Sequence, residues 1–147
     1  EARRLLALRD VLGLAAQVSF HGEVPEPRLQ QAMQSADLFV IAAWYEGYGM
    51  AVAEALGFGL PVVATAVGAA PALLGATDPA GAPWARAGLL VPPGDLAALT
   101  QALDAVLSDR SLRSALAAGA RQRATQLPTW PDAGRRIARV LEQVRAP

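Results

Sequence analysis

The chain has 147 residues, 53% of them hydrophobic, so it is long enough to bury a core and too apolar to be disordered. Its 13 basic residues, all of them Arg, balance 13 acidic residues, and a neutral chain without a basic cluster is a poor nucleic-acid binder. Since there is no Cys, disulfides, cysteine zinc sites and thiol nucleophiles are excluded, and no apolar run approaches the about 18 residues of a membrane span.

The first predicted elements are two helices with a short strand between them. Leucines at three- and four-residue steps predict a helix that ends at Gly13. Residues 18–20 predict a short strand, and the pair Glu26-Pro27 opens the next helix, because Pro is tolerated in a first helical turn. The chain starts without Met and directly in a helical pattern, so we expect it to be part of a longer protein.

The next segment predicts a compact β–α–β unit. Residues 38–42 are continuously apolar, which predicts a strand buried on both faces, as in parallel sheets. A loop over 44–49 leads into a helix over about 50–58 and a second buried strand at 62–64. Because ligands of such folds bind outside the carboxyl ends of the strands, the loop is the candidate site.

One more strand is predicted further along the chain. Residues 66–87 predict a short helix near 70–74 and then an irregular loop, and residues 89–91 predict the third strand. Alternating apolar strands and helices predict the α/β class, with a Rossmann-like parallel sheet flanked by helices.

Three helices are predicted after that strand. Asp95 is the expected N-cap of the first, residues 111–127 form the second, and Thr129 with Asp132 resembles a capping box that starts the third. The expected apolar stripes are Leu96, Leu99, Leu103, Val106 and Leu107 in the first helix, and Ala133, Ile137, Val140, Leu141 and Val144 in the third.

Two carboxylates, Glu46 and Glu54, flank a Gly-Tyr-Gly turn with seven residues between them. The glycines let a ligand approach the backbone, and the amides at the helix start, around Gly49, Met50 and Ala51, favour an anion such as phosphate. Carboxylates accept hydrogen bonds from hydroxyls. Hydroxyls at both ends and phosphate between them describe a nucleotide-sugar. The alternative is a tight strand-to-helix turn followed by an exposed Glu.

Residues 46–64, EGYGMAVAEALGFGLPVVA, closely resemble the signature of retaining glycosyltransferases of the GT-B fold. The nearest group is glycosyltransferase family 4, also called glycosyl transferases group 1. Residues 18–24, 36–40 and 88–95 resemble the flanking segments of the family, and Trp130 resembles the aromatic residue that opens its terminal helix. The resemblance covers nearly the whole chain.

This resemblance implies that residues 1–147 are a single partial domain, the C-terminal donor-binding domain of a two-domain enzyme whose first strands and N-terminal acceptor domain lie upstream. It implies retaining transfer of a sugar from a UDP-, GDP- or ADP-linked donor to an acceptor, without a metal or other cofactor. The family also holds the diphosphate with an Arg and a Lys upstream, and this chain contains no Lys. Because half of the ligand cleft would lie upstream, we expect the isolated chain to be inactive. We expect the whole enzyme to be cytoplasmic, either free or associated with the cytoplasmic face of a membrane.

Roles for individual residues also follow from the resemblance. Glu46 would be the catalytic residue, binding hydroxyls of the transferred sugar and stabilising positive charge at its anomeric carbon. Glu54 would hold the ribose hydroxyls, and the backbone of Val24 would lie against the base. The substrate-binding residues implied in total are Gly47, Tyr48, Gly49, Met50, Ala51, Glu54 and Val24.

Departures from the family pattern leave alternatives open. Ala69 and Ala72 stand where the family usually has Gly and Glu, which indicates either a changed sugar pocket or drift. They motivate the alternative of a non-catalytic nucleotide-sugar-binding or assembly module, or of a related phosphorylase or epimerase. Tyr45 and Tyr48 either line the ligand site or pack within the loop, and local packing is the first expectation for Trp44.

A basic patch on the last predicted helix, made of Arg135, Arg136 and Arg139, has two interpretations. The plain one is a solvated helix face. The alternative is a contact with the acceptor domain or, peripherally, with an anionic membrane surface.

Overall fold

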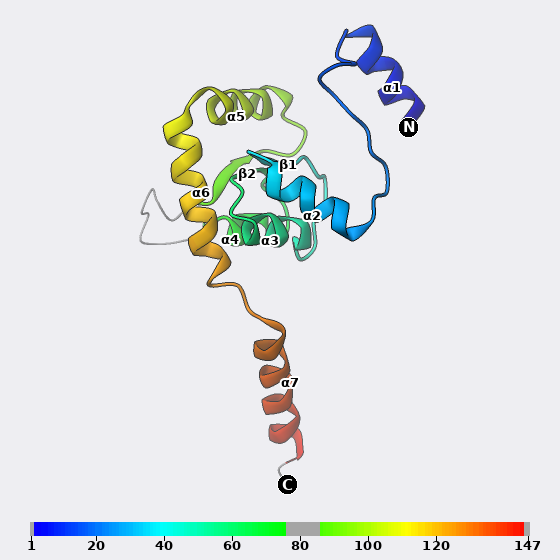
Figure 1. The fold of residues 1–147 in the computed structure, drawn as a ribbon. Coiled ribbons are helices and arrows are strands. Elements are labelled where there is room, and N and C mark those ends of the chain that lie inside the picture. The colour runs from blue at the N-terminus through cyan, green and yellow to red at the C-terminus, as the bar shows by residue number, and fades with distance from the viewer. Residues whose placement is uncertain (1, 76–85, 146–147) are drawn as a thin grey trace. The chain divides into compact units, whose positions relative to one another are not determined.

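The computed structural model describes residues 2–75 and 86–145 (Figure 1). The irregular loop predicted around Trp84 therefore lies mostly outside the described residues. The chain divides into two units, Glu1–Ala32 and Met33–Pro147, and each is treated by itself.

The first unit contains helix α1 (Ala2–Val11) and the start of α2 (Glu26–Ser35). Gly13 ends α1 as predicted: its φ of +68° is left-handed, and its N–H donates to the Asp10 carbonyl at 3.1 Å. The predicted strand over 18–20 is wrong, because the described residues there form no strand. The Val18 carbonyl instead accepts a hydrogen bond from Arg9, and the Arg9 guanidinium lies 6.0 Å from the centre of the Phe20 ring. A strand needs a neighbour for its backbone groups, and the described part of this unit offers none.

The second unit contains a parallel sheet in the order β1-β2-β3, formed by β1 (Phe39–Ile41), β2 (Val62–Thr65) and β3 (Gly88–Val91). Helix α3 (Met50–Gly57) connects the first two strands, as the predicted β–α–β unit requires. Helix α4 (Ala70–Leu73) follows β2, also as predicted. All three strands run the same way, so their carboxyl ends share one edge of the sheet.

Helices cover both faces of this sheet. Figure 1 shows α3 and α4 on one side and α5 (Leu96–Ser108) on the other. Side chains alternate along β2 accordingly: Val62 and Ala64 pack into the core under α3 and α4, whereas Val63 packs into the core under α5. Helix α6 (Arg110–Ala124) contributes to both cores. The predicted α/β architecture is confirmed.

Two burial predictions are wrong. Residues 38–42 were expected to be buried on both faces, but β1 is an edge of the described sheet and the Val40 side chain is 42% exposed. Only β2, which has neighbours on both sides, is buried along its whole length. In α5, Leu96 and Leu107 are 74% and 61% exposed, because they lie at the two ends of the helix. Val106 of the predicted stripe is fully buried, as expected, and Ala102, which was not in the stripe, is buried beside it.

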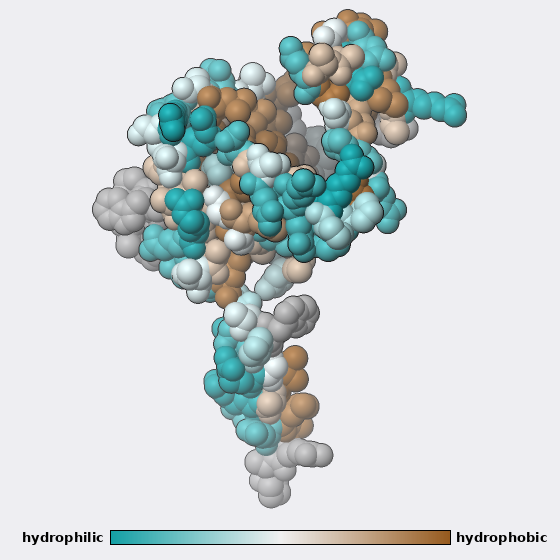
Figure 2. Space-filling view, in the orientation of Figure 1, coloured by the Kyte–Doolittle hydropathy of each residue, from teal (hydrophilic) through white to brown (hydrophobic). Residues whose placement is uncertain are grey.

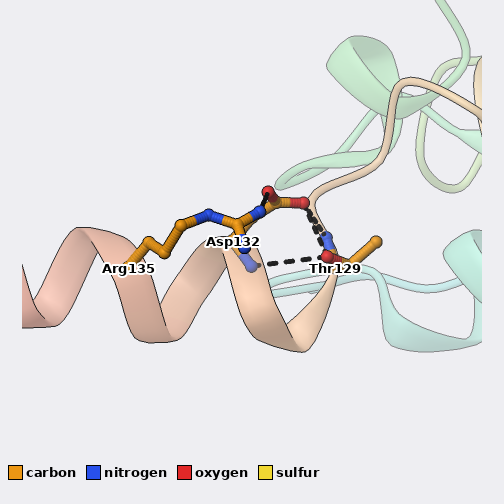
Figure 3. A network of polar contacts seen from close by, with 3 residues as sticks. All are labelled: Thr129, Asp132 and Arg135. Atoms are coloured by element: carbon orange, nitrogen blue, oxygen red, sulfur yellow. Dashed lines mark hydrogen bonds and ion pairs between the residues drawn. The ribbon is translucent and has the colours of Figure 1, made fainter.

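The predicted caps are present. The Asp95 carboxylate accepts from the Ala98 N–H at 2.9 Å at the start of α5. Before α7 (Trp130–Arg145), the Thr129 N–H donates to Asp132 at 2.9 Å and the Asp132 N–H donates to the Thr129 hydroxyl at 3.3 Å, a reciprocal capping box (Figure 3). Arg135 also pairs with Asp132. The Thr129 hydroxyl, the Thr129 N–H and Arg135, in that order, lower the pKa of the Asp132 carboxyl.

Helix α7 is amphipathic, and its predicted apolar stripe is exposed rather than buried. Figure 2 shows apolar side chains along one side of this helix and polar ones along the other. Ile137, Leu141 and Val144 are 61%, 58% and 78% exposed. Among the described helices, none combines the length and the apolar character that crossing a membrane requires.

Candidate functional site

The candidate site is the turn between β1 and α3, at the carboxyl edge of the sheet. Glu46 is half-buried there, and its Oε1 accepts a hydrogen bond from the Gly49 N–H at 3.0 Å. Gly49 is the N-cap of α3 and adopts a left-handed φ of +79°. A Cβ on Gly49 would lie 2.6 Å from Leu73 Cδ1, so α4 packs directly against this turn. Both the backbone angle and the contact require glycine at this position.

The loop after β2 holds the turn from a second side. Gly68 has a φ of +53°, and a Cβ there would lie 2.6 Å from the carbonyl carbon of Glu46 and closer still to its oxygen. The two backbones therefore touch, which any larger residue prevents. Nearby, the buried Thr65 hydroxyl donates to the Ala43 carbonyl at 2.6 Å. The position of the Glu46 backbone is thus fixed by the neighbouring loop and not by its own turn alone.

A third support comes from helix α6, far away in the sequence. The Arg123 guanidinium donates through Nε to the Leu73 carbonyl at 3.1 Å and through another nitrogen to the Ala72 carbonyl. These are the last carbonyls of α4: within the described residues the Leu73 carbonyl has no backbone donor, and the Ala72 carbonyl also accepts from the Gly75 N–H at 3.3 Å. Arg123 therefore anchors α4, and α4 packs under Gly49. Sequence reasoning missed this residue, since nothing local in the sequence links positions 50 apart.

Most of the predicted site residues lie together, because Glu46 to Ala51 are consecutive across the turn and the start of α3. The Gly49 N–H is already occupied by Glu46. Within the described residues, the N–H groups of Met50 and Ala51 make no hydrogen bond and remain open to a ligand. Glu54 is exposed on α3. Val24 belongs to the first unit, so its contact with a base stays a prediction.

Gly47 differs from the other glycines of the site. A Cβ there would meet nothing within 4 Å, and its φ is not left-handed. The structure therefore gives no steric reason for glycine at this position. In the described part of the chain, no group of three or more His, Cys, Asp or Glu side chains could hold a metal ion.

The aromatic residues of the turn point into solvent. Trp44, Tyr45 and Tyr48 are 78%, 85% and 62% exposed. The first expectation for Trp44, local packing, holds only for one edge of its ring, which contacts Gly94. Tyr45 and Tyr48 are not packed within the loop.

Comparison with known proteins gives the family. The model of the family described as "Glycosyl transferases group 1" matches residues 1–123. The lipopolysaccharide core biosynthesis mannosyltransferase LpsB of Rhizobium meliloti is 32% identical over 133 residues, covering 90% of this chain and 35% of that protein. The phosphatidyl-myo-inositol mannosyltransferase of Mycobacterium leprae is 35% identical over 134 residues, covering 90% and 33%. The chain thus spans about a third of the length of its curated relatives.

Solved structures agree with this result. Sucrose-phosphate synthase from Thermosynechococcus elongatus superimposes with a TM-score of 0.81 at 29% identity, covering 98% of this chain and 34% of that one. Anabaena Alr3699/HepE, solved in complex with UDP, has a TM-score of 0.78 at 26% identity, covering 97% and 36%. The parallel sheet between helices is that of GT-B glycosyltransferases, and the chain belongs to the glycosyl transferases group 1 family.

Proposed function

We propose that the chain is the donor-binding domain of a two-domain, retaining glycosyltransferase of family 4 type that uses a nucleotide-diphosphate sugar. The observation that carries this proposal is the fixed carboxylate of Glu46. One of its oxygens is occupied by the Gly49 N–H. The other accepts no hydrogen bond within the described residues, so it can take a sugar hydroxyl. The carboxylate thus fixes the residue before α3 with one oxygen and keeps the other for a ligand.

The amides beside it supply the second half of the argument. The free N–H groups of Met50 and Ala51 lie at the positive end of α3, which suits the diphosphate of the donor. Glu54, exposed on the same helix, is the proposed partner of the ribose hydroxyls. The relative solved with UDP supports a nucleotide at this domain. The positive charge for the diphosphate would come from outside the chain described here, as would the acceptor domain.

The backbone accommodates Ala69 and Ala72, the two residues that depart from the family pattern. Ala69 is the residue before α4 and has a helical φ of −81°, so the missing glycine causes no strain. Ala72 is exposed, and its carbonyl is held by Arg123. The loss of a carboxylate at Ala72 therefore changes the chemistry near the turn without changing its shape. Both departures are compatible with the fold, and of the two interpretations, a changed sugar pocket and drift, the proposal adopts the changed pocket.

The proposal is tested by substituting Glu46 in the intact enzyme. Glu46→Gln keeps an oxygen that accepts from Gly49 and removes the charge, whereas Glu46→Ala removes both. We expect both variants to lose about 10²–10³-fold in kcat, the usual effect of removing one electrostatic partner of a transition state. Only Glu46→Ala should also lower the free energy of unfolding, by about 0.5–1.5 kcal/mol, the net contribution of one hydrogen bond, here that from the Gly49 N–H. Unchanged turnover in Glu46→Gln would contradict the proposed role.

Binding and control measurements complete the test. Calorimetric titration with UDP, GDP and ADP should identify one tight nucleotide, and Glu54→Gln should weaken that nucleotide without lowering kcat to the same extent. Glu142→Gln, an exposed carboxylate on α7, is the matched control and should change neither quantity. Chelation of divalent cations by EDTA should leave turnover unchanged. If none of the three nucleotides bound, the alternative of a different binding module would replace the proposal.

A further inference from the structure

Trp44 is exposed and yet held in place. Its side chain is 78% exposed, in the loop that follows β1. One edge of the ring rests on Gly94, where a Cβ would lie 3.0 Å from Cζ3 and closer still to Cη2. Gly94 has a left-handed φ of +78°, so the close approach depends on a residue without a side chain. The indole is thus supported at its edge while its faces are open.

A small cavity adjoins this ring. It measures about 200 Å³ and is lined by the loops that follow all three strands, including Trp44, Thr65, Pro92 and Asp95. Sites for drug-sized ligands measure about 300–1,000 Å³, so this one suits a single small ring. It also lies at the carboxyl edge of the sheet, where ligands of this fold class bind.

Two polar side chains line the cavity, the buried Thr65 and the exposed Asp95. Asp95 uses Oδ1 to cap α5, and within the described residues its Oδ2 accepts no hydrogen bond. The Thr65 hydroxyl donates to the Ala43 carbonyl and keeps lone pairs that can accept. An aromatic face beside a carboxylate and a hydroxyl can bind a molecule with an apolar C–H face and a rim of hydroxyl groups. A pyranose ring has both.

We propose that Trp44 is a stacking platform for a pyranose ring of a carbohydrate substrate, and that Asp95 accepts a hydrogen bond from one of its hydroxyls. The π face of the indole is negative and attracts the positively polarised axial C–H groups of the sugar. The inference deepens the proposed glycosyltransferase function and rests on it for the identity of the reaction. Trp44 sets specificity and takes no part in bond breaking.

The ring belongs either to the donor sugar or to the acceptor. Gly49 packs against α4 on one face of the sheet, whereas Trp44 packs against Gly94, which leads into α5 on the opposite face. The platform and the free amides of α3 therefore flank Glu46 from two sides.

Calorimetry on the intact protein tests the proposal with four probes: UDP, UDP-glucose, GDP-mannose and methyl α-D-mannopyranoside. Trp44→Ala should lower the affinity for a sugar-containing probe about 3- to 10-fold, the factor that corresponds to one aromatic contact. It should leave the affinity for UDP unchanged. Trp44→Phe should restore much of the affinity. Asp95→Asn, which still caps α5, should weaken the same probe.

The pattern of the loss identifies the ring. If Trp44→Ala lowers the affinity for UDP-glucose or GDP-mannose but not for methyl mannoside, the platform binds the donor sugar. If it lowers the affinity for methyl mannoside but not for the nucleotide-sugars, the platform binds the acceptor sugar. The inference is overturned if Trp44→Ala changes no sugar-containing probe. It is equally overturned if Tyr45→Ala, which removes an 85% exposed aromatic outside the cavity, has the same effect. If no nucleotide bound the unaltered protein, the proposed donor function would be refuted instead. The effect of Trp44→Ala on the affinity for methyl mannoside would still test the role of Trp44.

Discussion

Gly68 offers the sharpest test of how the candidate site is built. A methyl group at this position would lie 2.6 Å from the carbonyl carbon of Glu46, and no side-chain rotation can relieve a clash with backbone. The left-handed φ of +53° adds about 1–2 kcal/mol for any residue other than glycine, and overpacking of this kind adds about 1–3 kcal/mol. Gly68→Ala should therefore lower the free energy of unfolding by about 2–5 kcal/mol.

Gly47→Ala is the matched control, because it adds the same methyl group one residue after Glu46. Nothing lies within 4 Å of that methyl group and the φ of Gly47 is not left-handed, so its effect should stay within about 0.5 kcal/mol. Urea unfolding measures both variants, and heating should separate them by roughly 2–4 °C for each kcal/mol. Turnover should also fall in Gly68→Ala, since the clash displaces Glu46, whereas Gly47→Ala is the control for stability only. Equal stability of the two variants would refute the idea that the loop after β2 positions the carboxylate.

Three further predictions concern two helix caps and the side chain that anchors α4. Asp109→Ala should cost about 0.5–2 kcal/mol, because Asp109 caps α6 by accepting from two N–H groups, whereas the exposed Asp104→Ala should cost less than about 0.5 kcal/mol by urea unfolding. The carboxyl of Asp132 should titrate by NMR below its ordinary pKa of 3.8, and Thr129→Val should return it toward that value; its contribution to stability is therefore complete above this pKa and lost as the pH falls through the lowered one. Arg123→Met should destabilise the protein by about 1–3 kcal/mol and lower kcat as well, while an unchanged kcat would show that α4 does not position the turn.

Local sequence signals predicted local structure well. Asp95 and the pair of Thr129 and Asp132 were identifiable as caps, because a cap depends on residues three positions apart. The β–α–β unit was predictable for the same reason, from one apolar run, one glycine-rich turn and one helix. The strand expected at 18–20 failed because strand formation depends on a distant partner. The burial of Val40 was overestimated, since the sequence does not state which strand lies at an edge.

In the candidate site, too, the contacts between residues close in the sequence were predictable and the long-range contacts were not. Glu46 and Gly49 follow from the motif itself, and the hydrogen bond between them joins residues three apart. The contacts that hold the turn from outside, made by Gly68 and Arg123, are long-range and leave no periodic pattern in the sequence. The exposure of the Trp44 side chain could not be predicted either, because a tryptophan in a loop is equally compatible with packing and with solvent.

The hydrogen bonds from Arg123 to α4 limit how far this domain can be truncated from its C-terminal side. Arg123 is the last residue matched by the family model, near the end of α6, and it hydrogen-bonds the end of α4, which packs against the turn that carries Glu46. A protein shortened by a single helical turn before that point would keep every residue of the motif and all three strands of the described sheet. It would nevertheless leave the Leu73 carbonyl at the end of α4 without its donor, so the turn that carries Glu46 would loosen although no residue in it had been changed.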